Sequence, residues 1–118
     1  MSVNKREERL ARDRANANQG EFFFATIRLS DGNEYRRPVF VIGKNGDSND
    51  EEDVIVCSCT TTDTRSNYDQ EVQLKFKTFV RTNKIYTTTR EKLEFKINSG
   101  LDSQAIQNLL AYCQRAIS

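Results

Sequence analysis

The chain has 118 residues, of which 36% are hydrophobic and 30% charged, and 18 basic against 17 acidic residues leave a formal net charge of +1. This length suits one domain with a modest core, and seven Phe with four Tyr are too many aromatic residues for a disordered chain. The small net charge neither predicts nor excludes a nucleic-acid partner, so any basic surface must come from the local arrangement of side chains.

Histidine is absent and cysteine occurs three times. The lack of imidazole excludes Ser–His–Asp triads and ribonuclease chemistry that uses a histidine base and a histidine acid. Cys57 and Cys59 lie two apart in an apolar strand-like run and Cys113 in a helical pattern, so three reduced, buried thiols are expected. No apolar run is long enough to span a bilayer, and a cytoplasmic protein is therefore expected.

Residues 1–19 form a charged leader with five basic and three acidic residues. Pairs four residues apart, such as Glu8 and Arg12, permit a helix, but the leader has too few apolar residues for a proper core face. A solvated or frayed helix is expected, and the alternative is a basic arm that contacts RNA.

Two strands are predicted next. Residues 21–29 are rich in aromatic and β-branched side chains, and Asp31-Gly32 indicates the following turn. The second strand is predicted from Arg37 to Lys44. Because Pro38 has no N–H, it belongs at the first position of a strand or on a sheet edge, so Arg36 and Arg37 are expected at the mouth of this strand.

The middle of the chain alternates loops with strands. Residues 45–53 predict an exposed acidic loop, in which Asp47, Asn49 and Asp50 lack the spacing of a calcium loop. Residues 53–59 predict a buried strand that leads into a hydroxyl-rich loop. Residues 71–77 alternate and predict a half-exposed strand with its apolar side chains inward, namely Val72, Leu74 and Phe76.

The C-terminal part predicts short strands over residues 79–81, 84–87 and 94–97, with a helical turn over residues 89–93. Asp102 or Ser103 is expected to cap a helix that runs to about Ala116 and carries one apolar stripe. Residues 20–118 therefore predict one α+β domain, mainly β: a small, strongly curled antiparallel barrel with a C-terminal helix.

Five segments occur in a distinctive order: Gly20-Glu21 before an aromatic strand, Arg-Pro-Val-Phe-Val-Ile at residues 37–42, an apolar strand ending in threonine at residues 54–61, a short strand at residues 84–87, and the capped helix. In this order they resemble the MazF/PemK (Kid-like) toxin family of bacterial type II toxin–antitoxin systems, over residues 20–117. The resemblance implies an SH3-like barrel, a homodimer, a cognate antitoxin as partner, and metal-independent, sequence-selective cleavage of single-stranded RNA without a cofactor.

The resemblance also implies roles for single residues. Arg37 matches the family's catalytic arginine and Thr60 its catalytic threonine. In this reaction the RNA 2′-OH attacks the adjacent phosphate and leaves a cyclic phosphate and a 5′-hydroxyl. Arg37 is expected to stabilise the charge on the pentacovalent phosphate, and Thr60 to donate a hydrogen bond to it. The remaining RNA-binding residues are predicted to be Arg36, Thr61, Lys84, Tyr86 and Arg28.

This chain departs from the family at its second charged group. Many members carry an arginine where this chain has Tyr86, and some carry an acid near Thr89. Tyr86 is expected to stack on a base or hold a phosphate, with Lys84 or Arg90 supplying charge, and the alternative is a packed ring with a wet hydroxyl.

Two other functions fit the same fold. A non-catalytic inhibitor like the related CcdB family, which poisons DNA gyrase, often ends in a Trp-Gly-Ile-like tail, whereas this chain has no Trp and ends at Ser118. A plain nucleic-acid-binding barrel would use the leader and a set of cations to bind RNA without cleaving it, with a steep salt dependence. Those cations are Arg65, Lys75, Lys77 and Arg81.

Overall fold

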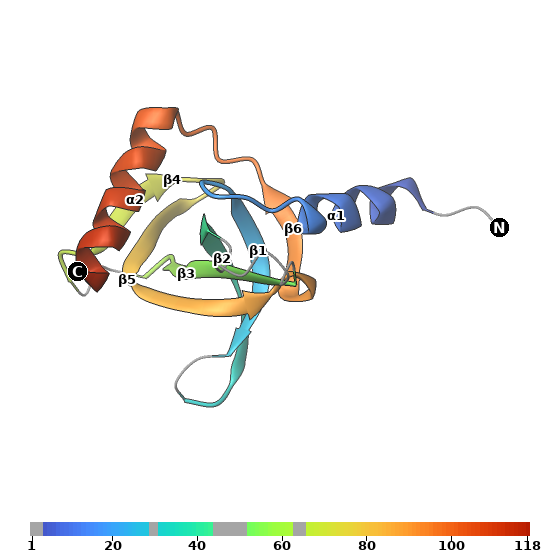
Figure 1. Cartoon of the computed structure of the whole chain (residues 1–118), viewed down its shortest axis with the longest axis horizontal. Helices are drawn as coiled ribbons and strands as arrows, with labels where there is room; N and C mark the ends of the chain where they lie inside the picture. The colour runs from blue at the N-terminus through green and yellow to red at the C-terminus, as the bar shows by residue number, and fades with distance from the viewer. Residues whose placement is uncertain (1–3, 29–30, 44–51, 63–65) are drawn as a thin grey trace.

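In the residues that the structure describes, six antiparallel strands form one sheet, and a helix lies near each end of the chain (Figure 1). The structure is a computed structural model that describes residues 4–28, 31–43, 52–62 and 66–118. The spatial order of the strands is β4-β5-β3-β2-β1-β6. Their bounds are β1 Phe22–Arg28, β2 Glu34–Gly43, β3 Asp53–Thr60, β4 Asp69–Gln73, β5 Lys77–Thr89 and β6 Leu93–Ile97, with a short 3-10 helix η1 Arg90–Lys92 and the α-helices α1 Lys5–Ala15 and α2 Ser103–Ile117.

The sheet is strongly curled. β5 and β6 are the second and the last strand in spatial order, yet only the three residues of η1 join them along the chain. A three-residue link cannot cross a flat sheet of this width, so the sheet must bend round on itself. The predicted antiparallel, barrel-like fold with a C-terminal helix is confirmed, although β4 and β6 remain as edges in the described pairing.

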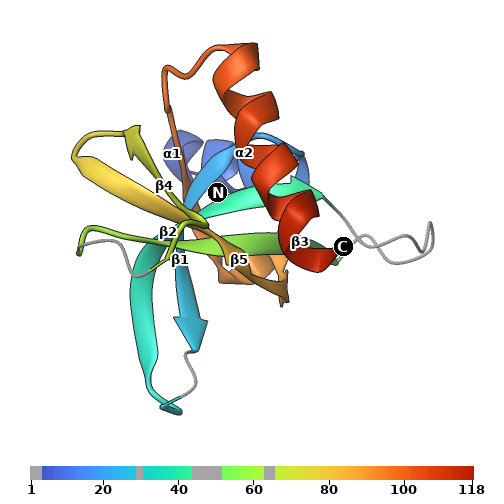
Figure 2. The ribbon, with the colours of Figure 1, turned by 90° about the vertical axis from the view of Figure 1, so that its left-hand side faces the viewer.

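Side chains alternate between two apolar clusters, one on each face of the sheet. Phe23, Val39 and Val56 belong to the first cluster, on the inner face of the curled sheet. Leu93 at the start of β6 is also buried in it. Phe22 and Phe40 belong to the second cluster, and their ring centroids lie 4.9 Å apart. Leu109 and Cys113 of α2 are buried in this second cluster. Figure 2 shows the ribbon of α2 lying across the sheet.

The strand that carries the arginine pair begins earlier than predicted. β2 starts at Glu34, so Arg36 and Arg37 lie inside a strand and not at its mouth. The first half of β2 pairs only with β1, with Phe24 opposite Pro38, and pairing with β3 starts at Val39. Pro38 therefore lies on a stretch of β2 that is not yet paired with β3. An unpaired sheet edge is the other place, besides the first position of a strand, where a residue without an N–H is tolerated.

The region after β3 also differs from the prediction. β4 ends at Gln73, and Phe76 is 68% exposed in the turn to β5, so its predicted inward position is wrong. The two short strands predicted over residues 79–87 are one strand, β5. Its register with β3 shifts in the middle: Val80 lies opposite Cys59, and Ile85 lies opposite Cys57. A step of five residues on β5 therefore matches a step of two residues on β3. The predicted break is therefore a bend within a continuous strand.

Both helices begin at capping residues. Asp102 accepts the Ala105 N–H at 2.8 Å at the start of α2, as predicted. Asn4 caps α1, none of whose residues is buried, which agrees with the expected solvated helix. No helix among the described residues is long and apolar enough to cross a membrane.

The three cysteines are free and buried, as predicted, and the Sγ atoms of Cys57 and Cys113 lie 4.0 Å apart. Most of the acidic loop, including Asp47, Asn49 and Asp50, and the cation Arg65 lie outside the described residues.

Candidate nucleic-acid interface and active site

A groove of about 820 Å³ opens on the part of the second face that α2 leaves uncovered. One wall comes from β1, β2 and β6, and the opposite wall from the turn between β4 and β5. The end of β3 forms the floor, with Cys59, Thr60 and Thr61. The groove thus collects segments that lie far apart in the sequence.

Aromatic rings line both walls of the groove. Phe24 and Phe95 face each other across the β1–β6 pair and stack, with ring centroids 5.2 Å apart and an interplanar angle of 20°. Phe76 lies on the opposite wall, largely exposed. Exposed rings beside cations are a typical platform for the bases of single-stranded nucleic acid.

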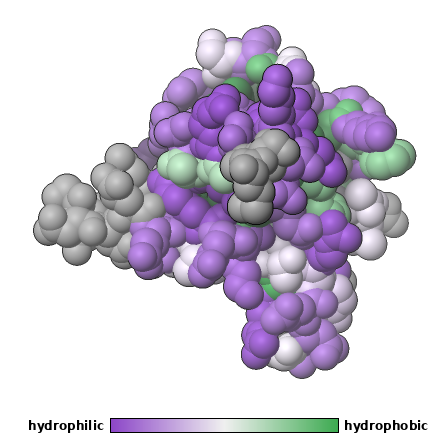
Figure 3. Space-filling view, turned by 90° about the vertical axis from the view of Figure 1, so that its right-hand side faces the viewer, coloured by the Kyte–Doolittle hydropathy of each residue, from purple (hydrophilic) through white to green (hydrophobic). Residues whose placement is uncertain are grey.

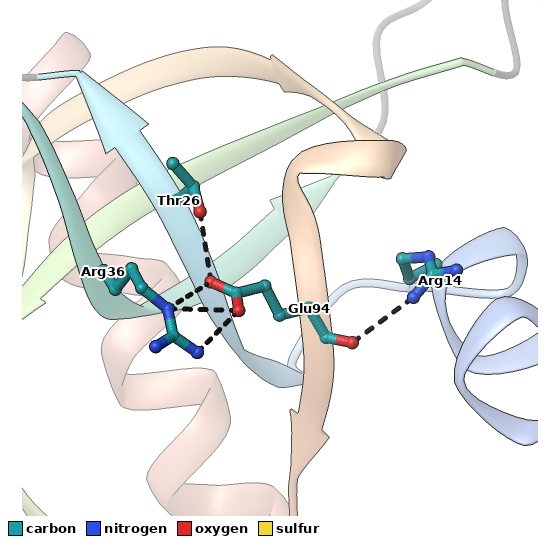
Figure 4. A network of polar contacts seen from close by, with 4 residues as sticks. All are labelled: Arg14, Thr26, Arg36 and Glu94. Carbon is teal, nitrogen blue, oxygen red and sulfur yellow. Dashed lines mark hydrogen bonds and ion pairs between the residues drawn. The ribbon is translucent and has the colours of Figure 1, made fainter. Parts of the chain in front are cut away.

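Arg36 is held on the first wall by a carboxylate. Its Nη2 and Nε donate to the Glu94 carboxylate at 2.7 to 3.1 Å, and its guanidinium lies 5.1 Å from the Phe24 ring centroid. The Thr26 hydroxyl donates to the same carboxylate at 3.1 Å (Figure 4). These hydrogen bonds, the Arg36 pair first, hold the pKa of Glu94 below its ordinary value. Glu94 is therefore an ionised anchor for Arg36.

Arg37 has different surroundings. Its guanidinium carbon lies 4.9 Å from the Tyr35 ring centroid, and it forms no ion pair with any described residue. Because Val39 pairs with Ser58, the same register two residues further places Arg37 level with Thr60. A guanidinium without a carboxylate partner keeps its full charge for a phosphate.

Thr60 is nearly buried at the end of β3. Its Oγ1 accepts the Thr62 N–H at 3.2 Å and lies 2.9 Å from the Thr62 hydroxyl. Either hydroxyl can be the donor in the contact between Thr60 and Thr62. When Thr62 donates, the Thr60 oxygen accepts and its own proton is available to a ligand.

The structure brings four of the predicted site residues into this groove: Arg36, Arg37, Thr60 and Thr61. Arg28 and Lys84 lie outside it, on exposed parts of β1 and β5, and Arg28 pairs with Glu34 at 3.3 Å. Tyr86 packs against the first apolar cluster, and its buried hydroxyl has no hydrogen-bond partner among the described residues. Burial raises the pKa of Tyr86, against a smaller lowering by Arg37, so the phenol stays protonated.

Sequence reasoning missed the wall that β6 supplies. Phe95, Lys96 and Glu94 reach the site because β6 pairs with β1, and no local pattern indicates which strand a short segment such as residues 93–97 will pair with. Phe24 lies in a predicted strand, but only the pairing of β1 with β6 indicates that its side chain lines a groove. Lys75, beside Phe76, adds a further cation to the opposite wall.

A comparison with protein families matches residues 18–116 to the family described as PemK-like, MazF-like toxin of type II toxin–antitoxin system. A comparison with curated proteins finds no match.

Solved structures share the fold at low sequence identity. An endoribonuclease in complex with its cognate antitoxin from a mycobacterial species superposes with a TM-score of 0.65 at 15% identity, over 85% of this chain and 93% of that one. The Mycobacterium tuberculosis toxin MazF-mt6 gives 0.62 at 19% identity, over 82% and 95%. The MazE–MazF complex of Deinococcus radiodurans gives 0.62 at 11% identity, over 86% and 94%.

The family match covers all six strands of the described sheet and α2 except its last residue, and it includes both Arg37 and Thr60. The chain therefore belongs to the family of PemK-like, MazF-like toxins of type II toxin–antitoxin systems.

Proposed function

We propose that this toxin is an endoribonuclease that cleaves single-stranded RNA through attack of a 2′-OH on the adjacent phosphate. The observation that carries the proposal is the position of Arg37 and Thr60, which line one groove from level positions on β2 and β3 in a member of this family. The aromatic walls of the same groove suit unpaired bases.

The proposed reaction needs no bound metal. The 2′-hydroxyl loses its proton to solvent water as its oxygen forms a bond to phosphorus. The bond from phosphorus to the 5′-oxygen breaks, and this oxygen takes up a proton from water, which leaves a cyclic 2′,3′-phosphate and a 5′-hydroxyl. Negative charge grows on the non-bridging oxygens, and the unpaired guanidinium of Arg37 stabilises it. Thr60 donates a hydrogen bond from its hydroxyl to one of those oxygens, and the bond that its Oγ1 accepts from the Thr62 N–H restricts the direction of that hydroxyl.

The family also supports proposals about partners. We propose that a cognate antitoxin holds the toxin inactive and that the toxin acts as a homodimer in the cytoplasm, where its mRNA substrate is found. A structural relative was solved with its antitoxin bound.

The first prediction tests the reaction itself. Purified protein is incubated with a long single-stranded RNA in EDTA, and the fragments are mapped and their ends identified. We expect discrete fragments with 5′-hydroxyl ends. Arg37→Ala is expected to lower the cleavage rate by about 10²- to 10³-fold, because it removes the main charge that stabilises the phosphate.

Thr60→Val is the matched change at the second position, since it keeps the shape and removes the proposed hydrogen bond to the phosphate, together with the two contacts of the Thr60 hydroxyl with Thr62. A hydrogen bond to a charged group contributes about 1.5–3 kcal/mol, which corresponds to a loss of roughly 10- to 100-fold in rate. Lys92→Gln removes an exposed cation outside the groove and serves as the control. Intact RNA in the presence of folded wild-type protein would contradict the nuclease and leave an RNA-binding barrel as the remaining function.

A further inference from the structure

The charges of α1 are segregated between its two sides. At about 100° per residue, most of its basic side chains fall within one arc of roughly 120°. Both glutamates, Glu7 and Glu8, fall outside that arc, and Asp13 is the one acid within it. The basic half of α1 consists of Lys5, Arg6, Arg9 and Arg12.

The basic half faces the same side of β6 as the candidate groove. Arg9 lines a second hollow of about 680 Å³ together with Lys96 and Asn98, and both of these also line the candidate groove. The other side of α1, with Ala11 and Arg14, faces a separate hollow near η1. The candidate groove and the basic half of α1 therefore meet at the end of β6.

The four side chains of the basic half are available for a ligand. All four residues are exposed, and none of their side chains forms an ion pair or hydrogen bond with a described residue. Figure 3 views the molecule from the side on which α1 lies and shows a surface that is mainly hydrophilic. By contrast Lys96, where the two hollows meet, is paired with Glu21 at 2.5 Å.

α1 is also held in a defined orientation. Arg90 donates to the carbonyl oxygens of Arg14 and Ala17, each at 3.0 Å, and Arg14 donates to the Glu94 carbonyl at 3.4 Å (Figure 4). Ala17, just after the helix, is buried in the first apolar cluster. A surface that is already ordered binds a ligand without the entropy cost of folding an arm.

From these observations we infer that the basic half of α1 is a second phosphate-binding surface, which holds the same RNA strand where it leaves the candidate groove across the end of β6. The family match begins at residue 18, so this surface is an addition to the matched domain. The inference rests on the proposed function, because the RNA in the groove is what brings the strand to α1.

The double variant Arg9→Gln, Arg12→Gln tests this in the full chain. Each phosphate contact to a single strand contributes about 0.7 to the slope of log affinity against log salt, so losing two contacts lowers the slope by roughly 1.4 and weakens binding about 10-fold at moderate salt. We expect this loss for a fluorescent RNA of about 20 nucleotides, measured by anisotropy, and a matching rise in KM with kcat unchanged.

A short RNA of about five nucleotides, centred on a mapped cleavage site, fills the groove alone, and the variant is expected to bind it as the wild type does. Lys92→Gln, Arg115→Gln removes the same charge from exposed positions that line neither hollow and controls for net charge.

The two proposals fail separately. If the wild type cleaves RNA but the variant keeps the wild-type salt slope and KM, the α1 surface is overturned and the nuclease stands. If the wild type binds RNA without cleaving it and the variant loses about 10-fold in affinity, the α1 surface stands and the nuclease is overturned. Equal losses in the variant and in the charge control would also overturn the α1 surface.

Discussion

Arg36 and Arg37 are neighbours in sequence and have opposite surroundings. Successive side chains of a strand alternate in direction, so Arg36 meets Glu94 and Phe24 while Arg37 lies over Tyr35. Both still border the groove, because this stretch of β2 is not paired with β3. The carboxylate orders Arg36 and also offsets its charge. At the residue scale, Arg37 is therefore the better candidate for stabilising a reacting phosphate, and Arg36 for holding the wall of the groove.

The Arg36–Glu94 pair makes a pH-dependent contribution to stability. The pKa of Glu94 is lowered in the folded protein, chiefly by its hydrogen bonds from Arg36. A lowered carboxyl pKa stabilises the fold at pH above the ordinary value of 4.5, and the contribution disappears as pH falls through the lowered pKa.

Glu94→Gln is therefore expected to be less stable than the wild type at neutral pH and equally stable in acid, when both are compared by urea unfolding across pH. Glu71→Gln removes the carboxylate of a looser, exposed pair with Lys77 at 3.8 Å and should change little at any pH. A stability difference between Glu94→Gln and the wild type that stays constant with pH would contradict the assignment.

At the scale of the elements, the join between the leader and β1 depends on Gly20. Its φ is +92°, and its N–H donates to the Val41 carbonyl at 2.8 Å. A Cβ at this position would lie 2.9 Å from Cγ2 of Ile106 on α2. Gly20 thus allows α2, β2 and the start of β1 to approach each other closely.

Gly20→Ala is expected to cost about 1–3 kcal/mol for the backbone conformation, and more because Ile106 must move. Gly100→Ala is the matched control, since φ is +68° there and no atom lies within 4 Å of the added Cβ. The free energies of unfolding from denaturant titrations should therefore fall further for Gly20→Ala than for Gly100→Ala. Equal losses would mean that the contact with α2 is unimportant.

The elements were largely predictable from local patterns, and the exceptions have a shared physical cause. Strand β1, strand β3 and the Asp102 cap follow from composition and alternation over a few residues. Phe76 fitted the alternation of the preceding strand, but the chain turns at Leu74–Phe76, and the alternation alone does not indicate where pairing stops. The same limit applies to β5, where the local pattern predicts a break and the structure has a bend.

At the scale of the whole molecule, the site follows from strand order. From the sequence, only the family resemblance assigns Arg37 and Thr60 to the same site. Neither an arginine near a proline in a strand nor a threonine at the end of a strand indicates a site by itself. The wall with Phe95 and the docking of α1 depend on the pairing of β6 with β1, which joins segments about 70 residues apart and carries no local signal.

The buried thiols provide a measure of how the whole domain opens. Cys59 is fully buried, burial raises its pKa, and the thiolate is the reactive form. We expect an aromatic disulfide reagent at mildly alkaline pH to modify native Cys59 at least about 10³-fold more slowly than the urea-unfolded chain, because only opened molecules react.

Gln107→Cys places a thiol on the exposed side of α2 and should react at the rate of a free thiol. Rapid modification of Cys59 in the folded protein, as fast as that of the introduced thiol, would show that β3 and α2 separate without global unfolding.

The hydrogen bonds that hold α1 lead to a consequence for how this leader can diverge. Arg90 and Arg14 both donate to carbonyl oxygens of the main chain, and every residue offers the same carbonyl. The attachment therefore does not depend on which side chains the exposed positions of α1 carry. The outer surface of the helix can therefore change in charge while the helix stays in place, so one scaffold can present different charge patterns by changes on one face.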